Sequence, residues 1–152
     1  MLPRDTIKGF RMIVENMDEH GFVKSLHLKL PKTVYKWKIH DVYAGGVPDA
    51  YYEGEEGCCW IEYKYVKSFP LRPTSIIKHS LSNLQKQWLR RANSNGQNAY
   101  VVIGSYDKVV ILSNEEWEIP LTNEYFDNNA LPRQAVVNWI TSICTTGRPS
   151  TL

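Results

Sequence analysis

Cysteine, net charge and long apolar segments are all scarce in this sequence of 152 residues. The three cysteines are an odd number and two of them are adjacent, which excludes a disulfide framework and is typical of a reducing compartment. No apolar run approaches the length of a membrane span, and the first residues lack the apolar core of a signal peptide. We find no internal repeat and no low-complexity segment. A cytoplasmic location without a membrane partner is therefore expected.

The net charge of +2 does not by itself indicate a nucleic-acid partner, but the charges are unevenly distributed. Residues 1–91 carry 15 Lys and Arg against 10 Asp and Glu, whereas residues 92–152 carry 3 against 6. Between Gly21 and His40 there are five lysines and no acid. One half of the chain can therefore present a positive face to phosphates. A solvated, lysine-rich loop is an equally good interpretation of this pattern.

Hydrophobic periodicity predicts the order helix, strand, hairpin, helix, strands, helix. The expected elements are a helix over residues 7–20 that ends at Gly21, a strand over 35–40, hairpin strands over 47–53 and 58–66, a helix over about 82–94, strands over 100–103 and 109–112, and a last helix over 131–144. This order favours an α/β fold with a mixed central sheet flanked by helices, and several folds satisfy it. We expect one domain, with a core over about residues 7–112 and an extension over about 113–152.

The helix over about 82–94 follows a proline-containing loop, and Ser80 or Ser82 is its expected N-cap. Its core face is expected to hold Leu81, Leu84, Trp88 and Ala92. The last helix is apolar enough to belong either to the core or to a dimer surface.

Three charged side chains on the expected hairpin can meet on one face of the sheet. Glu62 and Lys64 are two residues apart, so they project to the same side, and Asp49 lies on the partner strand. Two carboxylates held together repel each other unless a cation lies between them, and hard oxygen ligands suit Mg²⁺ or Mn²⁺. Such a site can hydrolyse a phosphodiester, with the lysine orienting the attacking water. An exposed cross-strand ion pair and an ordinary Pro-Asp turn are the common alternatives.

The surroundings of these charges favour function. Trp60, Ile61, Tyr63 and Tyr65 embed them in an apolar strand, where unpartnered charges are costly. The segments Gly46-Val47-Pro48-Asp49, Trp60-Ile61-Glu62-Tyr63-Lys64 and Leu81-Ser82-Asn83-Leu84-Gln85 follow one another in this order. Over roughly residues 7–104, the sequence resembles the PD-(D/E)XK nucleases. It is most similar to the branch with VRR-NUC domains, archaeal-type Holliday junction resolvases and small phage-encoded endonucleases.

The resemblance implies a restriction-endonuclease-like core with its elements in the order αβββαβ, here followed by an extra C-terminal helix. It implies an endodeoxyribonuclease that depends on Mg²⁺, with Mn²⁺ as a substitute. Such an enzyme hydrolyses DNA phosphodiesters and leaves 5′-phosphate and 3′-hydroxyl ends. It also suggests phage origin, in which case the location is the host cytoplasm.

The resemblance assigns roles to individual residues. Asp49 and Glu62 would be metal ligands and Lys64 the catalytic lysine, while Gln85 would support the site from its helix. The backbone carbonyl of Tyr63 is a candidate for a further ligand. The family often adds a carboxylate from the first helix, where Glu15 fits best and Glu19 stays open. Six basic residues are either contacts to the DNA backbone or solvated charges: Lys36, Lys38, Arg72, Lys78, Lys86 and Arg90.

Branched DNA, such as a four-way junction, is the expected substrate because the chain has no room for a separate sequence-reading domain. Resolving a junction requires two cuts, so a homodimer is expected, and no nucleotide cofactor is expected. Two alternatives stay open. One is a general or nicking DNA nuclease with the same site, and the other is a non-catalytic DNA-binding or assembly protein that retains the fold.

Overall fold

The computed structural model describes residues 18–40 and 43–151. In this part of the chain, six strands form one sheet in the order β1-β2-β3-β4-β5-β6. The strands are β1 (Tyr35–Lys38), β2 (Ala50–Glu53), β3 (Cys58–Tyr65), β4 (Ala99–Ser105), β5 (Lys108–Leu112) and β6 (Leu131–Pro132). The β3–β4 pair is parallel, and every other neighbouring pair in this sheet is antiparallel.

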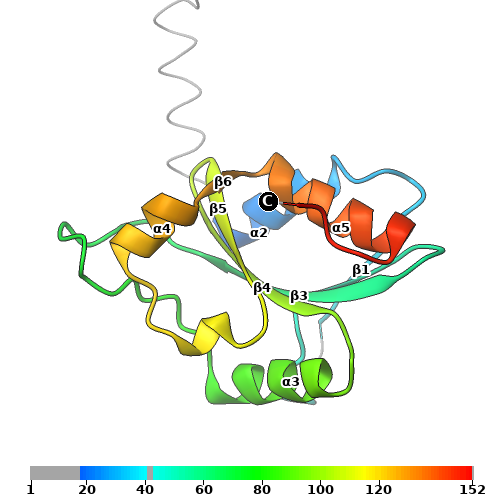
Figure 1. Ribbon diagram of the computed structural model, residues 1–152, viewed down its shortest axis with the longest axis horizontal. Helices are drawn as coiled ribbons and strands as arrows, with labels where there is room; N and C mark the ends of the chain where they lie inside the picture. The colour runs from blue at the N-terminus through cyan, green and yellow to red at the C-terminus, as the bar shows by residue number, and fades with distance from the viewer. Residues whose placement is uncertain (1–17, 41–42, 152) are drawn as a thin grey trace, which may run out of the picture.

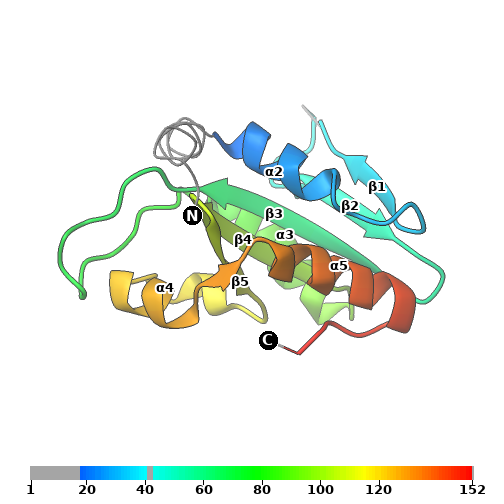
Figure 2. The same cartoon turned by 90° about the horizontal axis from the view of Figure 1, so that it is seen from above.

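Helices cover both faces of the sheet (Figure 1). On one face, α2 (Glu19–His27) and α5 (Gln134–Thr146) lie side by side, as Figure 2 shows from above. On the other face lies α3 (Asn83–Ser94), and the short helices η1 (Glu116–Glu118) and α4 (Asn123–Asn129) add to the core on that side. The order α2-β1-β2-β3-α3-β4 is the expected αβββαβ order, and α5 is the extra C-terminal helix. The expected α/β fold, with a mixed central sheet flanked by helices, is confirmed.

The two faces of β3 carry different kinds of side chain, because successive side chains of a strand point to opposite sides of the sheet. Cys59, Ile61 and Tyr63 belong to the core under α2 and α5. Glu62 and Lys64 point to the opposite face, which α3 covers. The sheet therefore presents these two charges toward α3 while it buries their neighbours on the other side.

The start of α2 corrects the expected end of the first helix. Asp18 is the N-cap, and its side chain accepts a hydrogen bond from the Gly21 N–H at 2.8 Å. Gly21 therefore lies in the first turn of α2, and the expectation that it ends a helix is wrong. Phe22, Val23 and Leu26 form the buried stripe of α2. The first part of the helix expected over residues 7–20, residues 7–17, lies outside the described residues.

The bounds of α3 agree with the sequence, but its buried face does not. Ser82 is the N-cap, and Asn95 follows the last helical residue as expected. The side chains toward the sheet recur at helical spacing: Gln85, Trp88, Leu89 and Ala92. Leu84, expected in the core, is 57% exposed. The helix is thus rotated so that Gln85 lies on the face that meets β3.

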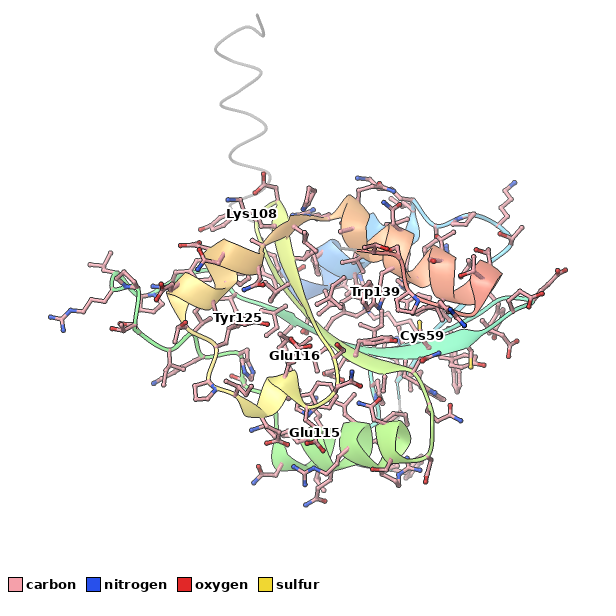
Figure 3. All side chains as sticks on the ribbon, in the orientation of Figure 1. Cys59, Lys108, Glu115, Glu116, Tyr125 and Trp139 are labelled. Atoms are coloured by element: carbon pink, nitrogen blue, oxygen red, sulfur yellow. The ribbon has the colours of Figure 1, made fainter. Side chains whose placement is uncertain are left out.

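The segment after β5 contributes to both faces of the sheet. The last helix begins at Gln134 rather than Leu131, because Leu131 and Pro132 form β6 and pair with β5. The apolar residues of α5 are buried, so the structure assigns this helix to the core. Trp139, labelled in Figure 3, belongs to this buried face. None of the helices in the described part of the chain has the length and apolar character that crossing a membrane requires.

Candidate active site

Asp49 is fixed at the point where β2 begins. β2 starts at Ala50, three residues later than expected, so Asp49 lies just outside the strand. Its backbone carbonyl accepts a hydrogen bond from the Ile39 N–H at 2.7 Å, and its side-chain Oδ2 accepts one from the Tyr63 N–H at 2.9 Å. The Asp49 carboxylate, rather than a backbone carbonyl, therefore accepts the hydrogen bond from the β3 backbone. This bond holds Asp49 beside Glu62.

Glu62 is the centre of the cluster. Its side chain is only 2% exposed, whereas that of Lys64 is 18% exposed. Glu62 Oε1 accepts a hydrogen bond from Gln85 Nε2 at 2.8 Å and lies 3.6 Å from Lys64 Nζ. Glu62 Oε2 is buried and has no hydrogen-bond partner among the residues that the structure describes. One carboxylate oxygen is thus held by a hydrogen bond and an ion pair, and the other has no donor in the described part of the chain.

The environment of Glu62 disfavours its ionised form. Burial is the main cause that raises the pKa of Glu62 from 4.5 to about 8, and the negative charge of Asp49 raises it further. The Lys64 ammonium opposes this change but does not cancel it. A carboxyl group with such a pKa would be largely protonated near neutral pH unless a cation compensates for its charge.

Gln85 connects the start of α3 to Glu62. Its backbone N–H donates to Ser82 Oγ at 3.2 Å, and its Oε1 accepts from the Ser82 N–H at 2.9 Å, which is a complete capping box. Because the side-chain carbonyl is held by the cap, the amide Nε2 is directed to Glu62. The cap of the helix and the orientation of the carboxylate therefore depend on the same glutamine.

The Gly45-Gly46 turn lets the chain before Asp49 approach α3. Gly46 has a φ of +87°, a conformation that favours glycine. A Cβ at Gly46 would collide with the backbone carbonyl of Leu84, and one at Gly45 would collide with the Leu84 side chain. Leu84 thus packs against this turn instead of the core, and the two glycines bring Asp49 close to the first turn of α3.

Glu19, one of the two carboxylates considered on the first helix, is coupled to the cluster. Partial burial raises the pKa of Glu19, and the charge of Asp49 raises it further, while Lys64 and Lys38 act in the opposite direction. Its charge is therefore within electrostatic reach of the carboxylate pair. Glu15 lies outside the described residues. Within residues 18–40 and 43–151, no group of three or more His, Cys, Asp or Glu side chains is placed to bind a metal.

Two of the six basic candidates lie together beside α2. Lys36 and Lys38 point away from α3, because their partners Tyr52 and Ala50 on β2 belong to the core under α2. A groove between α2 and β1, called here the α2–β1 groove, is lined by three lysines and two histidines: Lys24, Lys36, Lys38, His20 and His27. Burial, followed by the charges of Lys36 and Lys38, lowers the pKa of His27 to about 4. Its positive groups make this groove suited to anions.

The other four candidates lie in the loop after β3 and on α3. Arg72 and Lys78 are exposed in the loop after β3. Lys86 lies near the cluster, since its charge and that of Lys64 add to burial in lowering the pKa of His79, and its ammonium lies 3.9 Å from Glu118. Arg90 pairs with Glu118 at 2.5 Å and with Glu115 at 3.7 Å. Because two acids offset its charge, Arg90 is a weaker candidate for a phosphate contact than the sequence indicated.

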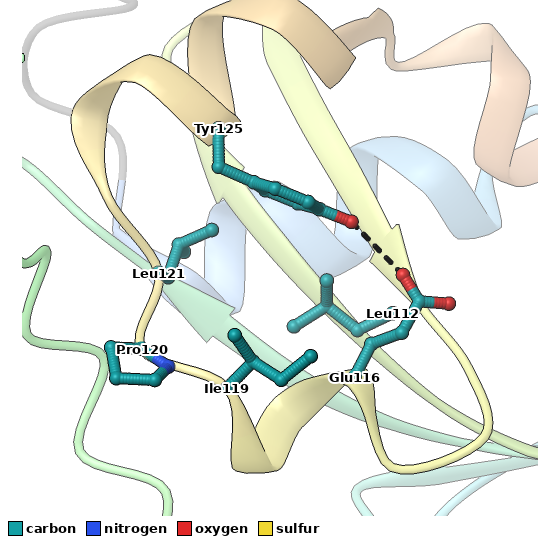
Figure 4. A pocket seen from close by; sticks show the side chains of 6 residues that line it. All are labelled: Leu112, Glu116, Ile119, Pro120, Leu121 and Tyr125. Atoms are coloured by element: carbon teal, nitrogen blue, oxygen red, sulfur yellow. Dashed lines mark hydrogen bonds between the residues drawn. The ribbon is translucent and has the colours of Figure 1, made fainter.

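A separate pocket lies between the end of β5, η1 and α4 (Figure 4). Its lining is apolar except for Glu116 and Tyr125, and the Tyr125 hydroxyl donates to Glu116 Oε2 at 2.9 Å. Neither Asp49 nor Glu62 lines it. The polar pair of this pocket is internally satisfied, so the cluster around Glu62 is the better candidate for chemistry.

Comparison with known proteins finds similarity among solved structures. No family model and no curated protein sequence matches the chain. Among solved structures, it is similar to Archaeoglobus fulgidus Hjc, a Holliday junction resolvase from an archaeal hyperthermophile. The alignment covers 74% of this chain and 97% of that chain, with 17% sequence identity and a TM-score of 0.46. At these values the chemistry of this chain has to be inferred from its own side chains.

Proposed function

We propose that this protein is a metal-dependent DNA endonuclease whose centre is formed by Asp49, Glu62 and Lys64. The observation that carries the proposal is the buried Glu62 carboxylate, with one oxygen held by Gln85 and Lys64 and the other without a donor in the described residues. Burying a carboxylate oxygen without a partner is costly. A hard cation between Glu62 and Asp49 would remove that cost and the repulsion between the two acids.

The donor set fits Mg²⁺ or Mn²⁺, which prefer oxygen ligands and keep open positions for substrate. Asp49 and Glu62 would hold the ion with the backbone carbonyl of Tyr63. In a strand, the N–H and C=O of one residue point to the same side, and the Tyr63 N–H already meets Asp49. The helix-borne carboxylate, Glu15 or Glu19, would act on the ion through its charge, and the charge of Glu19 is coupled to Asp49. When bound, the ion would polarise the scissile phosphate and lower the pKa of the attacking water.

Lys64 and Gln85 have different tasks in this proposal. The Lys64 ammonium is partly exposed next to Glu62, so it can orient the attacking water and stabilise the negative charge that develops on the phosphate. Gln85 is held by the cap of α3 and contacts Glu62, so it is a positioning residue. Lys36 and Lys38 in the α2–β1 groove would contact the DNA backbone, together with Lys86 near the cluster.

Branched DNA, with a four-way junction as the example, is the proposed substrate, and a homodimer would supply its two cuts. The test is Mg²⁺-dependent cleavage of a four-way junction, a matched linear duplex and single-stranded DNA. We expect paired nicks in the junction that are lost in Asp49→Asn and kept in Asp127→Asn, a matched change at an exposed acid of α4. Cleavage of all three DNAs would replace the substrate assignment with a general nuclease. Absence of cleavage would leave a DNA-binding or assembly protein.

The link between the cap and Glu62 predicts a selective defect in Gln85→Glu. A glutamate can still accept from the Ser82 N–H, but it cannot donate to Glu62 and it adds a negative charge. We expect initial cleavage rates at saturating Mg²⁺ to fall about 10- to 100-fold, the usual effect of losing a partner of a metal ligand. Ser82→Ala is the control, because it weakens the cap by about 1 kcal/mol and leaves the Gln85 amide in place. Equal rate losses in the two variants, both folded by urea titration, would contradict the positioning role.

A further inference from the structure

Aromatic side chains cross the α3-facing side of the sheet in register. Trp37 of β1 is paired with Tyr51 of β2, and Tyr51 is paired with Trp60 of β3. The rings of Tyr51 and Trp60 are 4.7 Å apart, and those of Trp60 and Trp88 of α3 are 5.1 Å apart. The Arg91 guanidinium lies over the Trp88 ring at 5.1 Å. We call Trp37, Tyr51, Trp60 and Trp88 the aromatic row.

Core packing explains only part of the aromatic row, because Trp60 and Trp88 pack against the core on the α3 side whereas Trp37 and Tyr51 are not part of it. Trp37 is 50% exposed, and Tyr51, Trp60 and Trp88 are partly exposed. In Figure 1, α3 lies below β3 and β4 and does not extend under β1. Partly exposed aromatics that follow one another across a surface mark a contact site more often than isolated ones do.

The row runs alongside the proposed active site. Tyr51 is two residues from Asp49 on the same face, and Trp60 is two residues from Glu62 on the same face. Two residues of a strand span roughly 6.6 Å. A nucleotide whose phosphate lies at the carboxylate pair can therefore reach the row with its base.

The charges beside the row favour one path for a nucleic-acid strand. The Arg91 guanidinium lies at the α3 end of the row, and Lys64 lies beside the row, next to the active site. On the opposite side lies Glu53, whose carboxylate accepts a hydrogen bond from the Tyr51 hydroxyl at 2.7 Å. Phosphates are thus attracted to the side of the active site and repelled from the side of Glu53.

We propose that the aromatic row stacks bases that are unpaired at the branch point of the DNA, next to the scissile phosphate, so that cleavage takes place where the branched substrate is locally single-stranded. The inference rests on the proposed function, which supplies DNA as the ligand. Aromatic rings and a stacked arginine bind the faces of any base, and paired bases hide their faces inside the duplex. The row therefore selects unpaired nucleotides by shape without reading their sequence.

The test is binding without cleavage, measured in EDTA by fluorescence anisotropy. The probes are a labelled duplex with two unpaired arms and a fully paired duplex of the same length. We expect Trp37→Ala to weaken binding of the splayed duplex about 5- to 100-fold and to leave the paired duplex unchanged. Trp37→Phe should restore most of the loss. Tyr35→Ala is the matched control, because Tyr35 is 59% exposed on the same face but is paired with Glu53.

Three outcomes would overturn the inference. Trp37→Ala could weaken both duplexes equally, or neither, or it could dissociate a dimer in sedimentation, which would make this face an interface between copies of the chain. Failure of the nuclease proposal would look different. In that case no DNA is cut with Mg²⁺, but Trp37→Ala still weakens binding of the splayed duplex and leaves binding of the paired duplex unchanged.

Discussion

Glu62→Gln is expected to abolish cleavage and, at the same time, to stabilise the metal-free protein. The amide cannot replace the carboxylate as a ligand, and loss of the charge stabilisation that a divalent ion gives corresponds to a rate decrease on the order of 10³-fold or more. The amide that replaces Glu62 keeps an oxygen that can accept the hydrogen bond from Gln85, so the local packing is preserved. The loss of activity would then not reflect unfolding.

The gain in stability follows from the pKa of Glu62. Burial and Asp49 raise it from 4.5 to about 8, so the folded state holds this proton more tightly than the unfolded state does. A raised carboxyl pKa contributes stability below pH 4.5 that is lost as the pH rises to about 8. The neutral amide has no such loss. At pH 8 to 9, without metal, we expect the variant to be more stable by about 2 to 4 kcal/mol.

Urea unfolding in EDTA at several pH values checks this expectation, with cleavage assays on the same preparations. Glu56→Gln is the control, because Glu56 is exposed in the β2–β3 turn and its neutralisation should change neither measurement. Equal free energies of unfolding for the native chain and Glu62→Gln across pH 5 to 9 would mean that ionised Glu62 does not destabilise the folded protein.

Binding of Mg²⁺ is expected to strengthen about tenfold for each pH unit up to about pH 8 and to level off above it. A metal ligand must be deprotonated, so each ion that binds below the pKa of Glu62 displaces one proton. Because Glu62 is only half ionised at pH 8, the affinity at pH 6 should be about 50-fold weaker than at pH 8. This pH dependence of Mg²⁺ binding follows from the raised pKa of Glu62, since a carboxylate with an ordinary pKa would already be ionised at both pH 6 and pH 8.

The shift of the unfolding temperature by Mg²⁺ at each pH measures this effect, because a ligand of the folded state stabilises it according to its affinity. Any residual binding by Glu62→Gln should lack the tenfold slope. A slope that is absent in the native chain, or equal in the two proteins, would contradict the assignment of Glu62 as the titrating ligand.

The hairpin, the cap of α3 and the cluster around Glu62 could all be predicted from the sequence, because each depends on local spacing. Side chains two apart on a strand share a face, and a serine three residues before Gln85 is a capping signal. The sequence did not reveal which face of α3 is buried. The sets Leu81, Leu84, Trp88 and Gln85, Trp88, Ala92 both have helical spacing, and only the approach of the Gly45-Gly46 turn to Leu84 decides between them.

Other features depend on contacts that no local pattern encodes. Gly21 can end one helix or lie in the first turn of the next, and the side chain of Asp18 selects the second role. β2 is shorter than expected because the Asp49 carboxylate replaces its first backbone bond to β3. The aromatic row needs the register of three strands, which alternation within each strand does not give. Neither η1 nor α4 was expected, since each is too short for a periodic signal.

The place of β1 at one end of the strand order has a consequence for solubility. An edge strand exposes backbone groups to which a strand of another molecule can add, and lysines on such an edge oppose this aggregation. β1 is four residues long, and two of them are Lys36 and Lys38. Antiparallel addition of a second β1 would bring four lysines together. The charges that we propose for holding phosphate therefore also keep copies of the chain from joining edge to edge, and high salt weakens both effects together.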